Sequence, residues 1–75
     1  MTDYVVLYER AEEGGWGAYL PDVPGVIALG ETRAEVERRM REAIRAYAEI
    51  AHEEGRSLPA ALHEADVLRV KEPVI

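Results

Sequence analysis

The sequence predicts an α+β domain, in which a three-stranded antiparallel meander plus a fourth strand forms a sheet with one long helix packed on one face. Three observations predict this class. Short runs of β-branched and aromatic residues precede residue 30, a long amphipathic segment follows, and a last apolar run lies near the end. With 75 residues the chain has the length of one small domain, so we expect a single domain over residues 1–75.

The first two strands are expected over residues 3–10 and 16–20. Residues 3–10 are dense in Val, Leu and Tyr, and their alternation places apolar side chains on both faces of the strand. Both faces are therefore expected to be at least partly covered. The connection between the two runs is polar and ends in a Gly pair, as is typical of a hairpin loop. A third short strand is expected over residues 26–29.

The segment between residues 21 and 35 holds a rigid turn, a short apolar run, a second turn and a helix-start signal. Proline fixes φ in the first turn, and Gly25 supplies backbone conformations that a side chain would forbid. Thr32 and Glu35 have the spacing of a capping box, in which each side chain satisfies an unpaired backbone N–H of the first helical turn. The positions that define this segment are Pro21, Asp22, Pro24, Gly25, Gly30, Glu31, Thr32 and Glu35.

A long helix is predicted between Arg33 and Glu54, because this stretch contains no Gly or Pro and is rich in Ala, Arg and Glu. Its length would be roughly 33 Å, and Gly55 is a typical residue just after a helix. One apolar stripe is expected to face the core. The stripe consists of Val36, Met40, Ala43, Ile44, Tyr47 and Ala51. Four pairs of opposite charge at i,i+4 spacing predict a solvated, ion-paired face. These pairs are Glu35/Arg39, Glu37/Arg41, Arg38/Glu42 and Arg45/Glu49.

The end of the chain is less regular. Residues 56–65 could form one helical turn or an irregular segment, because Pro59 interrupts them. Residues 66–71 return to strand character and are expected to join the sheet as its fourth strand. If this strand lies parallel to its neighbour, a right-handed crossover through the helix is expected. The predicted element order is then β-β-β-α-β.

Composition and charge limit the classes of partner. The formal net charge is −6 and the isoelectric point is about 4.8, which disfavours nucleic acid and favours a basic protein partner. There is no cysteine for a disulfide. No stretch approaches the length of a membrane span or a signal peptide, so we expect a cytoplasmic protein without membrane contact. Small size and a first strand that is apolar on both faces predict a homo-oligomer.

Catalytic chemistry is the weaker interpretation of the acidic residues. Several carboxylates could hold divalent metals for hydrolytic catalysis. These are Asp3, Asp22, Glu31, Glu35 and Asp66. Turn chemistry, the helix N-terminus and the capping box explain three of them without a metal. The two imidazoles, His52 and His63, accompany no recognisable nucleophile motif. We therefore predict no catalytic, metal-binding or cofactor-binding residue, and no cofactor.

The aromatic side chains allow two interpretations. Tyr4, Tyr8, Trp16 and Tyr19 could form a partner-facing surface, because exposed aromatics often anchor interfaces. They could equally complete the core of a small domain. The first strand, apolar on both sides, slightly favours an interface that is covered in an assembly. A stacking platform for RNA bases is the weakest interpretation, because the chain is acidic.

The motifs in this sequence resemble those of the HicB family of antitoxins. The resemblance rests on Gly-Gly-Trp at 14–16, Pro-Asp-Val-Pro-Gly at 21–25, Gly-Glu-Thr at 30–32, the capping-box Glu35 and Glu-Ala-Ile at 42–44. It implies a partial ribonuclease-H-like β-β-β-α-β fold. It also implies a protein that performs no chemistry of its own and masks a small basic ribonuclease toxin, HicA-like, by steric and electrostatic occlusion.

Two features depart from the family pattern. Many members continue into a DNA-binding segment, whereas this chain ends at Ile75, so direct DNA binding is not expected. Glu31 stands where the family commonly has Asp. The alternatives are a stand-alone protein-interaction module without a toxin or, as a weaker one, a degenerate ribonuclease-H-like domain that binds RNA or acts as a metal-dependent nuclease.

Overall fold

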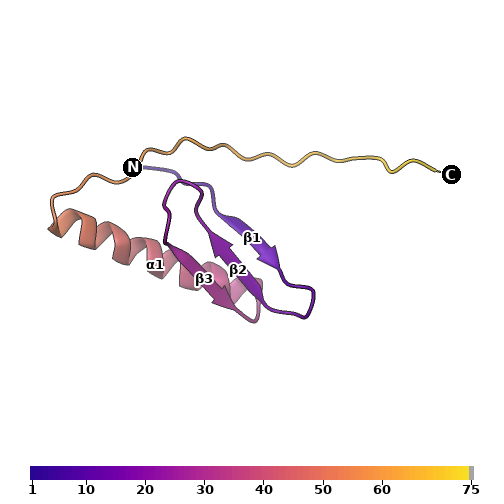
Figure 1. Ribbon diagram of the computed structural model, residues 1–75, viewed down its shortest axis with the longest axis horizontal. Coiled ribbons are helices and arrows are strands. Elements are labelled where there is room, and N and C mark those ends of the chain that lie inside the picture. The colour runs from indigo at the N-terminus through magenta and orange to yellow at the C-terminus, as the bar shows by residue number, and fades with distance from the viewer. Residues whose placement is uncertain (75) are drawn as a thin grey trace.

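Three strands precede one helix in the computed structural model, which describes residues 1–74 (Figure 1). The elements are β1 (Leu7–Arg10), β2 (Trp16–Tyr19), β3 (Ile27–Gly30) and α1 (Arg33–Glu53). The strands form one antiparallel sheet in the order β1-β2-β3. The predicted α+β class, the three-stranded meander and the single long helix are confirmed. The ribonuclease-H-like assignment stays a prediction.

The strand register separates two faces of the sheet. Tyr8 lies opposite Ala18, which lies opposite Ala28, and this row faces α1. Leu7, Tyr19 and Ile27 form a row of the opposite parity, so they lie on the face away from the helix. We call this second side the outer face. Two alanines at the centre of the inner row leave room for the helix to approach the sheet closely.

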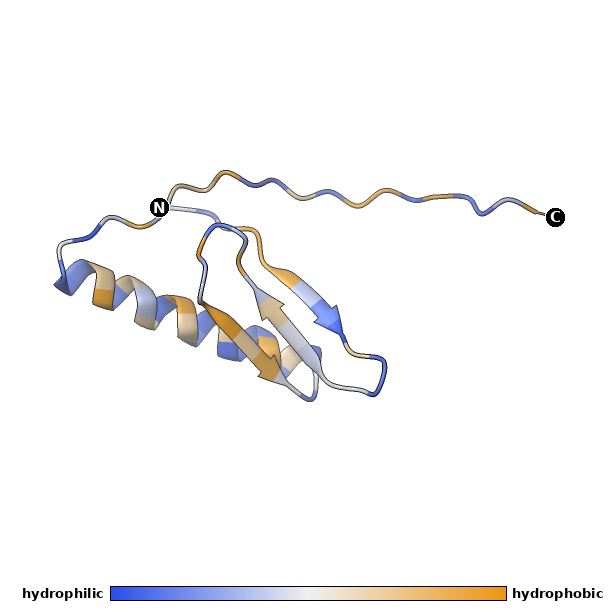
Figure 2. Cartoon of the chain, in the orientation of Figure 1, coloured by the Kyte–Doolittle hydropathy of each residue, from blue (hydrophilic) through white to orange (hydrophobic). Residues whose placement is uncertain are grey.

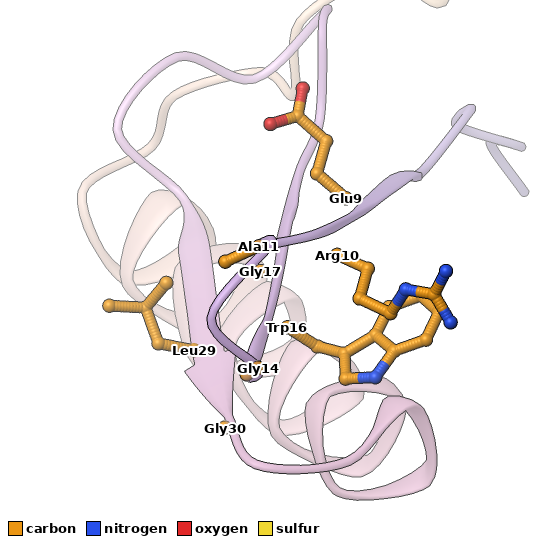
Figure 3. A pocket seen from close by; sticks show the side chains of 9 residues that line it. Glu9, Arg10, Ala11, Gly14, Trp16, Gly17, Leu29 and Gly30 are labelled. Carbon is orange, nitrogen blue, oxygen red and sulfur yellow. The ribbon is translucent and has the colours of Figure 1, made fainter.

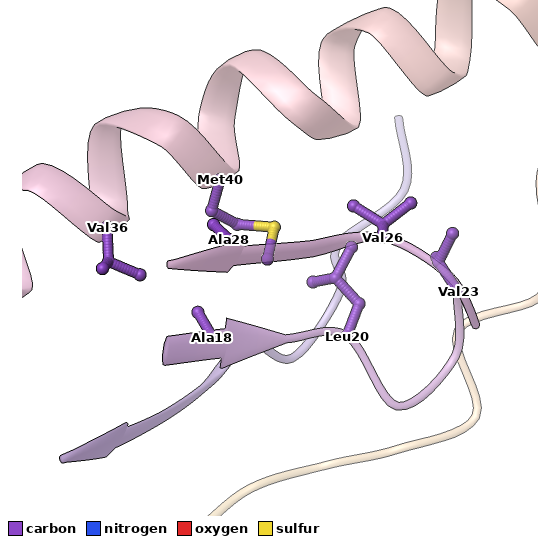
Figure 4. Close-up of a cluster of buried hydrophobic side chains, with 7 residues drawn as sticks. All are labelled: Ala18, Leu20, Val23, Val26, Ala28, Val36 and Met40. Carbon is purple, nitrogen blue, oxygen red and sulfur yellow. The ribbon is translucent and has the colours of Figure 1, made fainter. Parts of the chain in front are cut away.

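The core fills the space between the inner row and the apolar stripe of α1 (Figure 4). Val23 and Val36 are fully buried, one from the β2–β3 turn and one from the first turns of the helix. The other buried members of the cluster are Ala18, Leu20, Val26, Ala28 and Met40. The predicted helical stripe is confirmed, because Val36, Met40 and Ala51 are buried and Ala43, Ile44 and Tyr47 pack partly against the core.

Of the two hydrogen bonds in the capping box predicted at the start of α1, one forms. Thr32 is the N-cap, and its Oγ1 accepts the Glu35 N–H at 3.1 Å. The Glu35 carboxylate does not bond back to the Thr32 N–H, because it pairs with Arg39 at 2.6 Å. Within residues 1–74 the capping box is therefore single-sided. The helix ends at Glu53, and Gly55 follows with φ of 69°, a left-handed conformation that suits glycine.

The polar side of the helix carries fewer ion pairs than its spacing predicts. Glu35–Arg39 and Glu37–Arg41 form, at 2.6 Å and 3.2 Å. Arg33 also reaches Glu37, at 3.3 Å, a pair that was not predicted. In the part of the chain that the structure describes, Arg38/Glu42 and Arg45/Glu49 do not form ion pairs, because exposed side chains gain little from closing one. None of the helical structure in residues 1–74 has both the length and the apolarity needed to cross a bilayer.

Two predictions about strand boundaries and pairing are wrong. The first strand begins at Leu7 rather than at residue 3. The fourth strand expected at 66–71 does not join the sheet: residues 56–74 contain neither helix nor strand and run as an extended segment away from the domain (Figure 1). We call residues 56–74 the tail. Its residues 56–65, which the sequence left open, are irregular. A strand exists only where its backbone groups find a partner, and residues 66–71 find none within the described chain.

Candidate partner-binding surface

The turn between β2 and β3 is built as the sequence predicted. The Val23 N–H donates to the Leu20 carbonyl at 3.2 Å, and the Val26 N–H donates to the Val23 carbonyl at 3.3 Å. Gly25 has φ of 91°, which a residue with a side chain rarely adopts. Because Val23 is fully buried, this turn closes one end of the core. Pro21 and Pro24 flank Asp22 and Val23 in this turn.

Asp22, in the same turn, binds the tail. Its Oδ2 accepts the backbone N–H groups of Leu62 at 3.0 Å and His63 at 3.2 Å. Its Oδ1 lies 2.6 Å from Nδ1 of His63, and only 4% of the Asp22 side chain is exposed. Desolvation raises the pKa of the Asp22 carboxyl, but the hydrogen bonds from His63 and Leu62 outweigh it and hold the pKa below its ordinary value. The structure thus makes Asp22 an anchor for the tail.

A second contact holds the tail a few residues earlier. The Tyr4 hydroxyl donates to the Pro59 carbonyl at 2.5 Å. Burial, together with nearby Tyr47 and Asp22, raises the pKa of Tyr4 above its ordinary value, so its hydroxyl stays a donor. Sequence reasoning missed both contacts, since they join residues 40 or more positions apart. No local pattern signals such a pairing.

Of the positions that define the segment 21–35, those around the helix start lie at the opposite end of β3 from Asp22. Gly30 closes β3, Glu31 is exposed, and Thr32 caps the helix. A Cβ on Gly30 would lie 3.0 Å from Cγ2 of Val36, so this position lets the strand end approach the helix closely. The structure therefore does not bring the positions that define the segment 21–35 together in one site. They form two structural clusters, one at each end of β3.

The four aromatic candidates divide between the two interpretations. Tyr4, Tyr8 and Trp16 are half-buried and pack against the core, and the Arg33 guanidinium lies 4.1 Å from the centre of the Tyr8 ring. Tyr19 is more exposed, at 38%, and lies on the outer face. Three of the four thus pack against the core, whereas Tyr19 lies exposed on the outer face.

The outer face is an apolar surface on the side of the sheet opposite α1. Leu7, Tyr19 and Ile27 lie side by side across the three strands, and Leu29 follows Ile27 on the same side of β3. Ile27 and Leu29 are 62% and 66% exposed. Contiguous exposed apolar residues on a small domain mark an interaction surface more often than solitary ones do. Figure 2 shows the apolar colouring of β3 on a strand at the edge of the sheet.

A shallow hollow lies beside this face at the hairpin end (Figure 3). Arg10 and Trp16 form one side of it, with the guanidinium carbon 6.0 Å from the ring centre, and Leu29 lies on the other. Gly14 and Gly15 keep its floor free of side chains, and both have positive φ as the loop requires. Glu9 also lines the hollow.

The carboxylates singled out for metal chemistry are not brought together. Asp22 accepts hydrogen bonds from the tail, and Glu35 forms an ion pair with Arg39. Within residues 1–74, no group of three or more His, Cys, Asp or Glu side chains is placed to hold a metal ion. His63 is used by Asp22 and His52 lies exposed in the last helical turn.

Comparison with known proteins agrees with the sequence motifs. Residues 4–73 match the family model described as HicB-like antitoxin of bacterial toxin–antitoxin systems. The chain is also similar to the UPF0150 protein ssl0738 of Synechocystis sp., with 33% identity over 68 residues, which is 89% of this chain and 94% of that protein. The match spans every strand, the helix and most of the tail.

Proposed function

Because this chain belongs to the HicB-like antitoxin family, we propose that it binds and neutralises a small basic toxin, with a HicA-like ribonuclease as the partner. The observation that carries the proposal is the outer face, which presents exposed apolar side chains on a chain of net charge −6. Neutralisation would be by occlusion: the antitoxin covers the surface that the toxin uses for RNA, and no covalent bond changes.

The outer face combines the two features that such a partner needs. Its centre is apolar, with Tyr19 and Ile27 as the larger side chains, and interface centres are enriched in aromatic and aliphatic groups. Glu9 lies on the same side of β1, and further exposed carboxylates follow in the hairpin loop and after β3 at Glu31. Opposite charges accelerate the encounter and reject wrong partners, while apolar contact supplies affinity. A basic ribonuclease fits both features.

The first experiment replaces one residue on the outer face and one matched residue elsewhere. Ile27→Asp puts a charge in the centre of the proposed interface, and Ile50→Asp puts the same charge on the helix, where Ile50 is 51% exposed. Each variant is co-expressed with the basic protein encoded by the neighbouring gene. We expect Ile27→Asp to lose co-purification and protection from growth arrest, and Ile50→Asp to keep both.

Two results would contradict this proposal. A neighbouring gene that encodes no small basic protein, with no toxin rescued by this chain, would leave a stand-alone interaction module. Equal binding by both variants would show that the toxin uses another surface. Helical circular dichroism of each variant checks that a loss of binding does not come from unfolding.

A further inference from the structure

The tail after residue 63 is an arm without a partner. Val67, Leu68 and Val70 are 91%, 82% and 78% exposed. Within residues 64–74 the hydrogen bonding is only local, from the Val67 N–H to the Asp66 carboxylate. The radius of gyration is 15.4 Å, whereas a compact chain of this length has about 11 Å. Figure 2 shows apolar and polar positions alternating along this arm, the pattern of a strand with one face to be buried.

The contacts of Tyr4 and Asp22 with the tail direct the arm away from its own sheet. Tyr4 holds Pro59 and Asp22 holds Leu62 and His63, so the chain crosses the end of the sheet before the arm begins. From there the arm continues outward and does not turn back toward β1 or β3 (Figure 1). A segment with strand character that is directed outward is placed to pair with a sheet on another molecule.

Each sheet offers two edges, and the structure favours β1. At the β3 edge, the Leu29 carbonyl already accepts the Arg39 guanidinium at 2.6 Å, so a new strand would have to displace that bond. At the β1 edge, a groove of about 300 Å³ lies between the N-terminal segment and α1. Val6, Tyr8, Leu20, Met40 and Ile44 form its apolar lining. Side chains of a strand added to β1 would project into this groove.

The arm is complementary to that edge in polarity and in charge. If residues 66–72 run parallel to residues 4–10, Leu68 falls beside Val6 and Val70 beside Tyr8, both toward the groove. The same register places Lys71 beside Glu9 on the outer side. It also places Glu72 beside Arg10. Neighbouring strands gain from apolar pairs and opposite charges. One register therefore satisfies four positions at once.

We propose that two copies of this chain exchange arms: residues 66–72 of each copy add to the β1 edge of the other as a parallel fourth strand, with Leu68 and Val70 in the groove beside α1. The exchange removes an open edge from each sheet and buries the apolar side of each arm. Chains this short often need an added source of stability, and dimerisation supplies it here. The groove lies on the helix side of β1, whereas the outer face proposed for the toxin is centred on Tyr19 and Ile27.

Cysteine cross-linking tests the exchange directly, because the natural chain has no cysteine. Glu9→Cys in a tagged chain and Lys71→Cys in an untagged chain are unfolded together, refolded and oxidised. Both positions are exposed, so neither change disturbs the core. We expect a disulfide between the tagged and the untagged chain, since adjacent strands bring Cα atoms within the range that a disulfide spans. Glu13→Cys, in the hairpin loop, replaces Glu9→Cys as the control and is expected not to link.

The double variant carrying Glu9→Cys and Lys71→Cys separates exchange from closure within one chain. Arm exchange gives covalent dimers. A disulfide inside a single chain, with no mixed product from the two single variants, would show that the arm folds back onto its own sheet and would overturn the proposal. Absence of any link between positions 9 and 71 would overturn it as well.

Sedimentation provides an independent measurement on the full chain. The natural protein is expected to have the mass of a dimer at tens of micromolar. Leu68→Asp with Val70→Asp is expected to lose the dimer while keeping the helical signal, because it places two charges in the groove. Val74→Asp, equally exposed at 93% but beyond the paired region, is expected to stay dimeric. A monomeric natural protein, or a dimer in both variants, would overturn the proposal.

Discussion

At the scale of single residues, Asp22 joins the β2–β3 turn to the tail. Its place after Pro21 predicts a turn residue, and the turn is there. Its carboxylate, however, accepts two amide N–H groups from the tail and lies against the His63 imidazole. A carboxylate with several donors stabilises its charged form. Asp22 thus links the β2–β3 turn to the tail, whose last residues form the arm.

Acid is expected to release this anchor. The pKa of Asp22 is lower in the folded chain than in the unfolded chain, where it has the ordinary value of 3.8. The carboxylate therefore stabilises the anchored tail at any pH above that value, and this contribution is lost as pH falls through the depressed folded pKa. Hydrogen exchange of the Leu62 amide measures it: protection should persist at pH 4 and above, and fall below the ordinary range of aspartate.

Asp22→Asn is the matching variant for this prediction. It keeps an acceptor oxygen but has no charge to lose, so the Leu62 amide should be less protected at neutral pH and insensitive to acid. Asp66→Asn removes a carboxylate that makes only the local contact to Val67 and should behave as the natural chain does. Protection that falls already near neutral pH in the natural chain would contradict the assigned role of Asp22.

At the scale of elements, the junction between β3 and α1 depends on close approach rather than on the cap alone. Gly30 meets Val36 and Glu35, and Arg39 reaches back to the Leu29 carbonyl. The sequence gives the Gly and the Thr32 cap, but it cannot show that Glu35 prefers Arg39 to the backbone, since both partners lie within its reach. Side-chain geometry decided that competition.

Two glycine substitutions test this packing. Gly30→Ala would place Cβ 3.0 Å from the buried Val36 and 3.2 Å from Glu35, and such overpacking costs about 1–3 kcal/mol. Gly17→Ala would lie 3.2 Å from the end of the exposed Leu29 side chain, which can move, and at an ordinary contact distance of 3.7 Å from the Ala28 carbonyl oxygen. Urea unfolding should therefore show a clear loss of stability for Gly30→Ala and little for Gly17→Ala. Equal losses would mean that the β3–α1 junction is not the tighter contact.

The elements that local pattern could predict are those that need no distant partner. The amphipathic stripe of α1 and its apolar contacts follow from spacing alone, and the hairpin follows from its glycines and flanking apolar runs. The strand character of residues 66–71 was also visible in the sequence, but its pairing was not. Pairing depends on where Tyr4 and Asp22 hold the preceding residues, and those contacts span some 40 positions or more.

The same limit applies to the candidate surfaces. Sequence alternation marks Leu7 and Tyr8 as lying on opposite sides of β1, yet both sides are apolar and nothing local says which one the helix covers. The structure decides this through the row of small residues, Ala18 and Ala28, that admits α1. Ile27 and Leu29 then lie on the outer face. The sequence pattern predicted only that they belong to a short apolar strand.

At the scale of the whole molecule, the two proposals assign separate surfaces to separate partners. Toxin binding uses the outer face around Ile27, and arm exchange uses the β1 edge and the groove beside α1. The substituted positions have no contact in common, because Ile27 lies on β3 and faces away from the groove, so their effects are expected to be nearly additive. The exchange-deficient chain with Leu68→Asp and Val70→Asp should therefore still bind toxin, one to one, and the toxin-deficient Ile27→Asp chain should still form dimers.

Mass measurement of the complexes checks this independence. The natural antitoxin and its toxin should form a complex of two chains of each, whereas the exchange-deficient variant should form a complex of one and one. Raising the salt concentration should slow toxin association, since charge attraction between the acidic chain and a basic partner is screened. It should leave the dimer largely intact, because apolar contacts in the groove are not screened. If removal of the arm pairing also abolished toxin binding, the two surfaces would have to be parts of a single interface that exists only in the dimer.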